Sequence, residues 1–253
     1  MRHDYLIRKR DALLASSGLF WLPSGYSADD VFAAYLFKGV ASADVSREDV
    51  TGHGYTLTLG SESGNSPSWD ASRGWKFSTE YQGQQGYLTN STLNGRNIKT
   101  AVVRYANRAN ANRCWLITAG GSSGLVQLCA ATAVWDTDES TVRTYSGPGY
   151  PHGEDKWTYC SMGNAAAVVG ANFGSSNKLY INGGHMTSYV HTINASTSKG
   201  SQQSWRTFGN THAAISDLNN ANHSGKDIIC AAFFAVALTD EQHKEVAQRM
   251  AAL

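Results

Sequence analysis

The most constraining feature of the chain is an apolar run, residues 228–238, followed at once by helix-start signals. The run is about half as long as the ~20 apolar residues that a membrane-spanning helix needs. A short run of this kind is typical of a strand that is buried on both faces. Thr239 followed by Gln242 forms a capping box, which marks the start of a helix. Val246 and Met250 then repeat at helical spacing, so the sequence predicts a buried strand that leads into a short C-terminal helix.

Composition narrows the class of fold and excludes some partners. A chain of 253 residues is long enough for one large all-β domain or two small ones. The 25 glycines, together with frequent serine, threonine and asparagine, indicate many turns and short strands. Only 16% of the residues are charged and the net charge is +1, so little basic surface exists to neutralise the phosphates of a nucleic acid. We therefore expect no nucleic-acid partner and no membrane span.

The start of the sequence lacks the pattern of a secretory signal. The apolar residues 5–7 are followed at once by the basic residues 8–10, which interrupt any apolar core. We therefore expect the protein to be made in a cytoplasm without a signal peptide.

The first part of the chain differs from the rest. A short helical pattern is followed by the apolar segment 18–23, which must pack either on its own domain or on a partner. This pattern predicts an N-terminal arm over residues 1–25, which serves docking or oligomerisation. One β-domain over residues 26–253 follows the arm.

The cysteines lie in apolar, strand-like contexts. None belongs to a Cys-x-x-Cys pair, so a zinc site is not indicated. They are either buried thiols or include one disulfide between neighbouring strands. The positions concerned are Cys114, Cys129, Cys160 and Cys230.

The first half of the β-region opens with a recognisable order of elements. A strand is expected over Val31–Phe37, and a glycine-rich turn follows over residues 49–54. The turn feeds an alternating stretch that places Tyr55, Leu57 and Leu59 on one face of a strand. Another strand is expected over residues 98–105.

The second half continues the same order. Leu179–Gly183 has the pattern of a hairpin that turns at Asn-Gly, and Ser204–Asn210 that of a strand ending in Gly-Asn. Together with the final strand and helix, these motifs resemble the laminin-G-like and concanavalin-A-like jelly rolls. The resemblance covers about residues 31–253. It implies an all-β fold, an antiparallel β-sandwich with the N-terminal arm and a short C-terminal helix.

The resemblance also implies a protein that binds rather than catalyses. Glycosidases on this fold carry two carboxylates in the spacing Glu-x-Asp-x-x-Glu, because one must act as acid and one as nucleophile. No such spacing occurs, and the acidic clusters at residues 136–139 and 154–155 have the pattern of charged turns. We therefore expect no enzyme, and an unusual glycoside hydrolase remains an alternative.

A calcium ion is the only cofactor that the residues suggest. Asp136, Asp138 and Glu139 supply the oxygen ligands that hard cations prefer. The spacing of a calcium loop with its central glycine is absent, so these residues are weak candidates. Otherwise no metal or cofactor is expected.

The most suggestive surface is the segment that begins at Tyr145 and ends at Trp157. It places aromatic residues on a stretch stiffened by glycine and proline, among polar groups. Sugars are bound by aromatic rings that stack on their apolar faces while polar neighbours hold their hydroxyls. The candidate glycan-binding residues are Tyr145, Tyr150, His152 and Trp157. The alternative is that Trp157 starts a strand and packs in the core.

These observations favour a non-catalytic structural or adhesion protein. The resemblance to domains frequent on phage surfaces implies a virion component, such as a tail, fibre or capsid-surface protein that binds host glycans. The expected partners are other virion proteins, contacted through residues 1–25, and further copies of this chain. A bacterial lectin-like carbohydrate-binding module is the alternative. The expected location is the virion, or otherwise the cytoplasm or the extracellular space.

Overall fold

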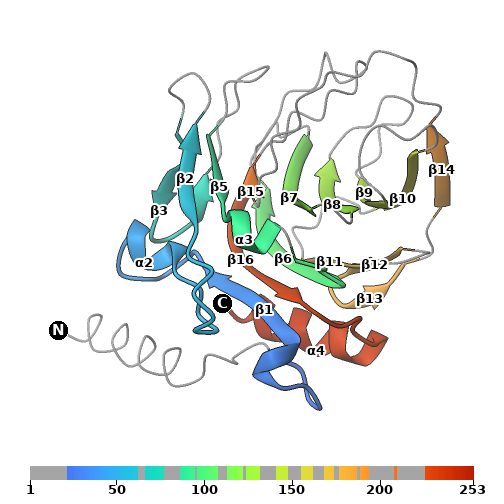
Figure 1. Cartoon of the computed structure of the whole chain (residues 1–253), viewed down its shortest axis with the longest axis horizontal. Coiled ribbons are helices and arrows are strands. Elements are labelled where there is room, and N and C mark those ends of the chain that lie inside the picture. Colours follow the sequence, from blue (N-terminus) through green and yellow to red (C-terminus); the bar gives the residue numbers. More distant parts are fainter. Residues whose placement is uncertain are drawn as a thin grey trace.

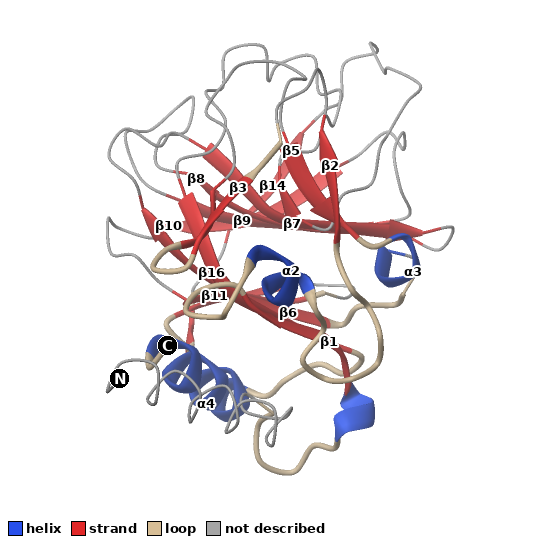
Figure 2. Cartoon of the chain, turned by 90° about the vertical axis from the view of Figure 1, so that its left-hand side faces the viewer, coloured by secondary structure: helices blue, strands red, loops and turns tan. Residues whose placement is uncertain are grey.

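The described part of the chain forms three antiparallel β-sheets and a C-terminal helix (Figure 1). The computed structural model describes residues 22–61, 66–76, 86–94, 96–107, 113–121, 124–131, 141–147, 155–161, 168–173, 177–186, 189–193, 208–209 and 226–253. Two sheets form opposite layers, and helix α4 (Asp240–Ala251) lies beneath the larger one (Figure 2). The antiparallel β-sandwich with a short C-terminal helix is therefore confirmed.

The larger sheet has eight strands and is built around the strand that the apolar run predicts. That strand, β16 (Lys226–Phe234), pairs with three others: β6 (Thr100–Asn107), β4 (Gly74–Lys76) and β1 (Val31–Leu36). The remaining strands are β3 (Ser68–Asp70), β11 (Val168–Asn172), β12 (Lys178–Ile181) and β13 (Gly184–His185). All printed pairings within this sheet are antiparallel.

Strand β16 is buried on both faces, as predicted. Every residue from Ile228 to Phe234 is at most 5% exposed. The pairing with β6 shifts between Ile228 and Cys230, so that Ile229 is an extra residue in the ladder. The carbonyl of Ile229 accepts hydrogen bonds from the backbone N–H groups of Phe37 and Lys38, at 2.8 and 3.2 Å. The extra residue is thereby tied to the segment that follows β1.

The other two sheets are smaller. The five-stranded sheet runs in the order β14 (Tyr189–Ile193), β10 (Asp155–Ser161), β9 (Thr141–Gly147), β8 (Gly124–Ala131) and β7 (Arg113–Gly121). The three-stranded sheet contains β15 (Phe208–Gly209), β5 (Gly86–Thr89) and β2 (Thr58–Ser61). The short helices are η1 (Ala28–Asp30), α2 (Ala43–Arg47) and α3 (Ser91–Asn94).

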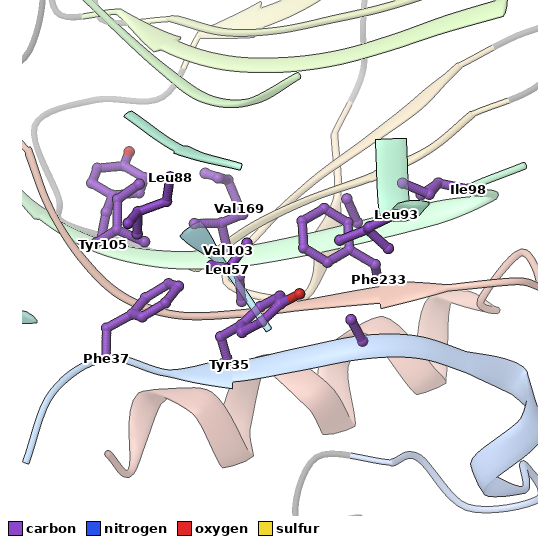
Figure 3. Close-up of a cluster of buried hydrophobic side chains, with 14 of the residues drawn as sticks. Tyr35, Phe37, Leu57, Leu88, Leu93, Ile98, Val103, Tyr105, Val169 and Phe233 are labelled. Atoms are coloured by element: carbon purple, nitrogen blue, oxygen red, sulfur yellow. The ribbon is translucent and has the colours of Figure 1, made fainter. Parts of the chain in front are cut away.

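The inner core covers one face of the eight-stranded sheet (Figure 3). Tyr35 and Phe37 on and after β1 lie with their rings parallel, the centroids 5.8 Å apart. Tyr35 also meets Phe233 of β16 edge to face at 6.3 Å. The Tyr35 hydroxyl donates to the carbonyl of Tyr55 at 2.6 Å, so its polar atom is satisfied within the core. Burial raises the pKa of this phenol well above its usual value.

Helix α4 covers the opposite face of the same sheet. Its predicted capping box is present: Thr239 accepts from the Gln242 N–H at 3.3 Å, and Gln242 accepts from the Thr239 N–H at 2.8 Å. Val246 and Met250 are fully buried against the outer face of β16. Among the described residues, no helix has both the length and the apolar character to cross a bilayer.

The segment just before η1 lies along α4. Ser24 donates from its backbone N–H and its hydroxyl to the carboxylate of Glu245, at 2.9 and 3.1 Å. Arg249 donates to the carbonyl of Leu22 at 2.9 Å, and its guanidinium is also paired with Glu245. The boundary between an arm over residues 1–25 and the β-domain stays a prediction, because residues 1–21 lie outside the described part of the chain.

Two turns expected from the sequence have well-defined geometry. Asn182 and Gly183 join β12 to β13 with positive φ values of 51° and 81°, as a tight hairpin turn requires. In the turn over residues 49–54, the Asp49 carboxylate accepts from the Ala34 N–H at 3.1 Å and from the Thr51 N–H at 3.0 Å. The turn is therefore fastened to β1.

The stretch after this turn departs from the alternation expected of it. Tyr55 and Leu57 are buried, but Leu59 is 45% exposed. Leu59 lies in β2, which pairs with β5 in the three-stranded sheet rather than joining the large sheet. The strand thus leaves the core before its third apolar residue.

Candidate functional site

The structure brings together two of the residues predicted to bind a glycan. Tyr145 lies in β9 and Trp157 in β10, and their Cα atoms are direct partners in the antiparallel register. Tyr145 and Trp157 are therefore neighbours on adjacent strands, although in the sequence they stand at opposite ends of one segment. The other predicted site residues lie outside the described residues: Tyr150, His152, Asp136, Asp138 and Glu139.

The pair belongs to a row that crosses the five-stranded sheet. Gln127 of β8 is the partner of Tyr145 on one side, and His191 of β14 is the partner of Trp157 on the other. The sequence analysis missed Gln127 and His191. The alternation of Tyr189 and His191 in β14 is a signal that could have drawn attention to this strand, but only the register joins it to Tyr145.

A second row on the same side of the sheet contains an arginine. In this row Cys129, Arg143, Tyr159 and Tyr189 are successive partners across β8, β9, β10 and β14. Positions two residues apart on a strand share a face of the sheet, so the two rows share one face. We call this surface the aromatic face and define it by Gln127, Cys129, Arg143, Tyr145, Trp157, Tyr159, Tyr189 and His191.

The alternating positions between these rows have a different character. One such row runs through Leu128, Thr144, Thr158 and Val190, and the next contains Ala130, Val142 and Cys160. These positions combine aliphatic and small residues with threonines, and the pair Lys156 and Thr192 belongs to the same side. Our hypothesis is that the aromatic face is the side turned away from the core.

The two buried carboxylates of the described residues both have structural partners. Asp227 of β16 accepts from Arg73 at 2.7 Å (Nε) and 2.6 Å (Nη2), and only 3% of its side chain is exposed. Asp49 accepts from backbone N–H groups and from the Thr51 hydroxyl at 2.8 Å. Both carboxylates are therefore engaged in contacts that hold the fold together.

A polar cluster under α4 is the other notable arrangement. The His243 ring stacks on the Tyr180 ring with centroids 3.5 Å apart, and its Nε2 lies 2.9 Å from Asn172 Oδ1. The Tyr180 hydroxyl donates to Asp240 at 2.8 Å. Thr100 donates to Asn172 Oδ1 at 2.6 Å. These contacts join α4 to β6, β11 and β12.

The titratable groups of this cluster are shifted toward their neutral forms. Burial lowers the pKa of His243 to about 3, and Asp240 offsets this effect only in part. Burial, followed by the hydrogen bond to Asp240, raises the pKa of Tyr180 above its usual value. His243 is 1% exposed, so this cluster docks the helix and offers no open site.

A metal site is not apparent in the part of the chain that the structure describes. No group of three or more histidine, cysteine, aspartate or glutamate side chains suited to a metal ion occurs there. The calcium candidates at residues 136–139 lie outside that part, so their role stays a prediction. Cys230 is a buried free thiol.

No protein family and no curated protein matches the chain. Among solved structures, it is similar to a mutant of HCR/D, with 13% identity, a TM-score of 0.44 and coverage of 87% of this chain and 51% of that one. It is also similar to botulinum neurotoxin type C, in a structure that describes cell entry as dependent upon interaction with two ganglioside molecules. The identity there is 14%, the TM-score 0.44 and the coverage 88% and 52%.

A third similar structure is a mutant of Trypanosoma rangeli sialidase displaying trans-sialidase activity. The identity is 12% and the TM-score 0.49, over 97% of this chain and 39% of the sialidase chain. The chain thus spans about half the length of the first two similar chains and less of the third. The assignment as an antiparallel β-sandwich follows from the sheet topology of this chain itself.

Proposed function

We propose that this protein is a non-catalytic carbohydrate-binding β-sandwich that holds its ligand on the aromatic face. The observation that carries the proposal is the direct pairing of Tyr145 with Trp157 across β9 and β10. Two aromatic positions side by side offer a stacking surface for the apolar face of a sugar ring. Gln127 and His191 extend the row on both sides and supply hydrogen-bonding groups for hydroxyls.

The proposal of a non-catalytic protein is supported by the carboxylates. Glycoside hydrolysis needs two carboxyl groups that flank one bond. The sequence has no Glu-x-Asp-x-x-Glu spacing. Asp49 and Asp227, the buried carboxylates of the described residues, are engaged in hydrogen bonds and an ion pair. An unusual glycoside hydrolase is the alternative, and release of reducing sugar from a bound glycan would favour it.

The test is retention on a glycan array. We expect the wild type to bind a subset of glycans, and the double variant Tyr145→Ala/Trp157→Ala to lose that binding. The matched control is Thr144→Val/Thr158→Val, which changes the next cross-strand pair on the same two strands but on the other face. The control should bind like the wild type. The proposal fails if the wild type binds no glycan, or if both double variants bind equally well.

We further propose that the module belongs to a phage virion, as a structural or adhesion component that docks through its N-terminal arm. The low charge and the glycine-rich composition support this proposal. Leu22 and Ser24 contact α4, which lies on the side of the eight-stranded sheet away from the five-stranded sheet (Figure 2). An arm that docks there would leave the five-stranded sheet on the side toward a host (Figure 2). A bacterial lectin-like module is the alternative.

A truncated chain distinguishes the virion component from the bacterial lectin-like module. Removal of residues 1–21 retains the contacts of Leu22 and Ser24 with α4, so we expect a folded domain with an unchanged melting temperature. In a virion component, this truncation should abolish oligomerisation or incorporation into particles, as measured by sedimentation. If the truncated chain assembles like the full chain, the arm does not mediate docking. The lectin-like module would then be the assignment that stands.

A further inference from the structure

An exposed arginine lies against two aromatic rings beside strand β1. The guanidinium carbon of Arg96 is 6.0 Å from the ring centroid of Phe32 and 5.6 Å from that of Tyr55. Both distances lie within the range in which a cation is attracted to the face of an aromatic ring. Phe32 belongs to β1 and Tyr55 follows the turn over residues 49–54, so two separate segments supply the rings. Tyr55 is buried and Phe32 half-buried, whereas Arg96 itself is exposed.

Backbone contacts hold both sides of this arrangement. The Arg96 N–H donates to the carbonyl of Leu93, and the Arg96 carbonyl accepts from the N–H of Ile98, both at 3.0 Å. Leu93 and Ile98 are buried, so the residue that carries the guanidinium is anchored from both directions. On the ring side, Nδ1 of His53 lies 3.1 Å from the carbonyl oxygen of Phe32 and ties the turn to β1. Binding costs less side-chain entropy when the groups that bind are already held in place.

The Arg96 guanidinium has no acidic partner in the part of the chain that the structure describes. By contrast, Arg47, Arg73 and Arg249 are each paired with a carboxylate. Asp49, the acidic residue of the adjacent turn, accepts hydrogen bonds from backbone N–H groups and from a hydroxyl instead. The positive charge and the N–H donors of Arg96 are therefore available to a ligand.

The turn beside the two rings is open to solvent. A Cβ built at Gly52 or at Gly54 would have nothing within 4 Å. Thr56 and Asn97, the residues that follow the buried ring and the arginine, are both exposed. They are polar but uncharged, so they offer hydrogen bonds without neutralising the arginine. A ligand at Arg96 would thus approach from solvent and meet no acidic residue among these neighbours.

The chemistry of a guanidinium narrows the class of ligand. Its planar fork of N–H donors matches a carboxylate with two parallel hydrogen bonds. Contact of a ring with the face of the guanidinium leaves these in-plane donors free for an anion. One guanidinium also balances the single charge of a carboxylate, whereas a sulfate or phosphate dianion would keep a net negative charge.

We infer that Arg96 binds the carboxylate of a ligand, with Phe32 and Tyr55 as the residues that position the guanidinium. The ring contacts, the exposure of the arginine and its lack of an acidic partner among the described residues carry this inference together. None of these residues belongs to the aromatic face. The inference therefore goes beyond the proposed function and does not depend on it.

The experiment is an NMR titration of the full chain with acetate, sulfate, glucuronate and N-acetylglycine at constant ionic strength. The resonances followed are the Nε–H of Arg96, the backbone N–H of Asn97 and the ring protons of Phe32. We expect saturable shifts with the carboxylates, and binding of sulfate that is weaker by about threefold or more. Glucuronate and N-acetylglycine distinguish a sugar carboxylate from a peptide carboxylate, and saturable binding of either supports the site.

Another arginine gives an internal control in the same spectra. The side chain of Arg73 is 55% exposed, but it is paired with Asp227. Its Nε–H already donates to that carboxylate at 2.7 Å, so this resonance should show no saturable shift. The comparison separates a free guanidinium from one that is merely exposed.

Substitutions test the charge, the fork and the rings in turn. Arg96→Gln should weaken acetate binding by about tenfold or more, and Arg96→Lys, which keeps the charge without the planar fork, by about threefold. Phe32→Leu should also weaken it by about threefold, whereas Phe32→Tyr keeps a ring and should bind like the wild type. Lys178→Gln removes an exposed positive charge from β12 and should leave binding unchanged. The melting temperature of each variant reports whether the domain stays folded.

Three results would overturn the inference. The first is a shift at Arg96 that stays as linear as that at Arg73. The second is equal binding of acetate by the wild type and Arg96→Gln, and the third is binding of sulfate as tight as that of the carboxylates. Each can occur whether or not the aromatic face binds glycans, so the two proposals fail separately.

Discussion

The two large sheets of this protein share an antiparallel ladder but differ in what lies on their faces. From Ile228 to Phe234 in β16 of the eight-stranded sheet, both sets of alternating positions are apolar and buried, because the inner core covers one face and α4 the other. In β9 and β10 of the five-stranded sheet, aromatic positions and Arg143 alternate with threonine, valine and cysteine positions. A strand covered on both faces has no surface left for a ligand. The first sheet is therefore a scaffold, and the second carries the surface that we propose for binding.

The strongest test of this comparison is a matched pair of truncated aromatic side chains. Phe233 of β16 is fully buried, so Phe233→Ala should lower the free energy of unfolding by about 3–5 kcal/mol. Trp157→Ala in β10 should cost about 1 kcal/mol or less if its position lies on a presenting surface. Urea unfolding at neutral pH measures both. A loss for Trp157→Ala as large as that for Phe233→Ala would place Trp157 in the core and end the comparison.

A second pair of variants tests how tightly α4 lies on the scaffold sheet. Gly183 has a φ of +81°, and a Cβ built there would lie 2.4 Å from the Cα of Lys244 in α4. Gly183→Ala should therefore cost about 3 kcal/mol, from the backbone strain and from displacement of the helix. Gly52 has a similar φ of +83° but nothing within 4 Å of its Cβ position.

Gly52→Ala is thus the control for backbone strain alone, and it should cost about 1–2 kcal/mol. Chemical unfolding of both variants gives the difference between them. Equal losses would mean that the close approach of Gly183 to α4 contributes nothing, and the covered face of the sheet would be less tightly packed than described.

The smallest expected effect is a dependence of stability on pH. The pKa of His243 is about 3 in the folded protein, below its ordinary value, so between pH 6.5 and pH 3 the unfolded chain binds more protons than the folded one. Stability should therefore fall as the pH falls through this window, by about 2 kcal/mol between pH 7 and pH 5. Asp240 and His185 face the ring and oppose each other in their effect on its pKa.

His243→Gln isolates this contribution. The variant should lose most of the dependence on pH over the same interval, whatever its absolute stability, because glutamine does not titrate. Thermal or urea unfolding at pH 7, 6 and 5 makes the comparison. If wild type and variant showed parallel pH profiles, protonation of His243 would not be what loosens the covered face of the sheet.

Local signals predicted the scaffold well. The apolar run and the capping box of Thr239 and Gln242 lie within a few residues of each other, so β16 and α4 could be predicted with nearly correct bounds. The Asn182–Gly183 turn is equally local, because it depends on the conformational freedom of two residues. Leu59 shows the limit of such patterns, since alternation predicts a side of a strand but not the point where the strand leaves the core.

The candidate site could be predicted only in part. Tyr145 and Trp157 stand out in the sequence as aromatics in a segment rich in glycine and proline. Their pairing across β9 and β10 depends on strand register, which no short stretch of sequence encodes. Gln127 and His191 join the row from strands that are distant along the chain. Nothing in the local sequence distinguishes Arg143 from other charged residues, and only the strand register shows that it lies beside Tyr159.

The extra residue at Ile229 has a consequence for the evolution of this strand. Ile228, Ala231 and Phe233 belong to the inner cluster, whereas Ile229, Cys230, Ala232 and Phe234 belong to the cluster under α4. Deletion of Ile229 would move every side chain between that position and one end of the strand to the opposite face of the sheet. Insertions and deletions there are therefore far more disruptive than substitutions. We therefore expect related sequences to differ in side-chain size at this position but to keep the same number of residues in the strand.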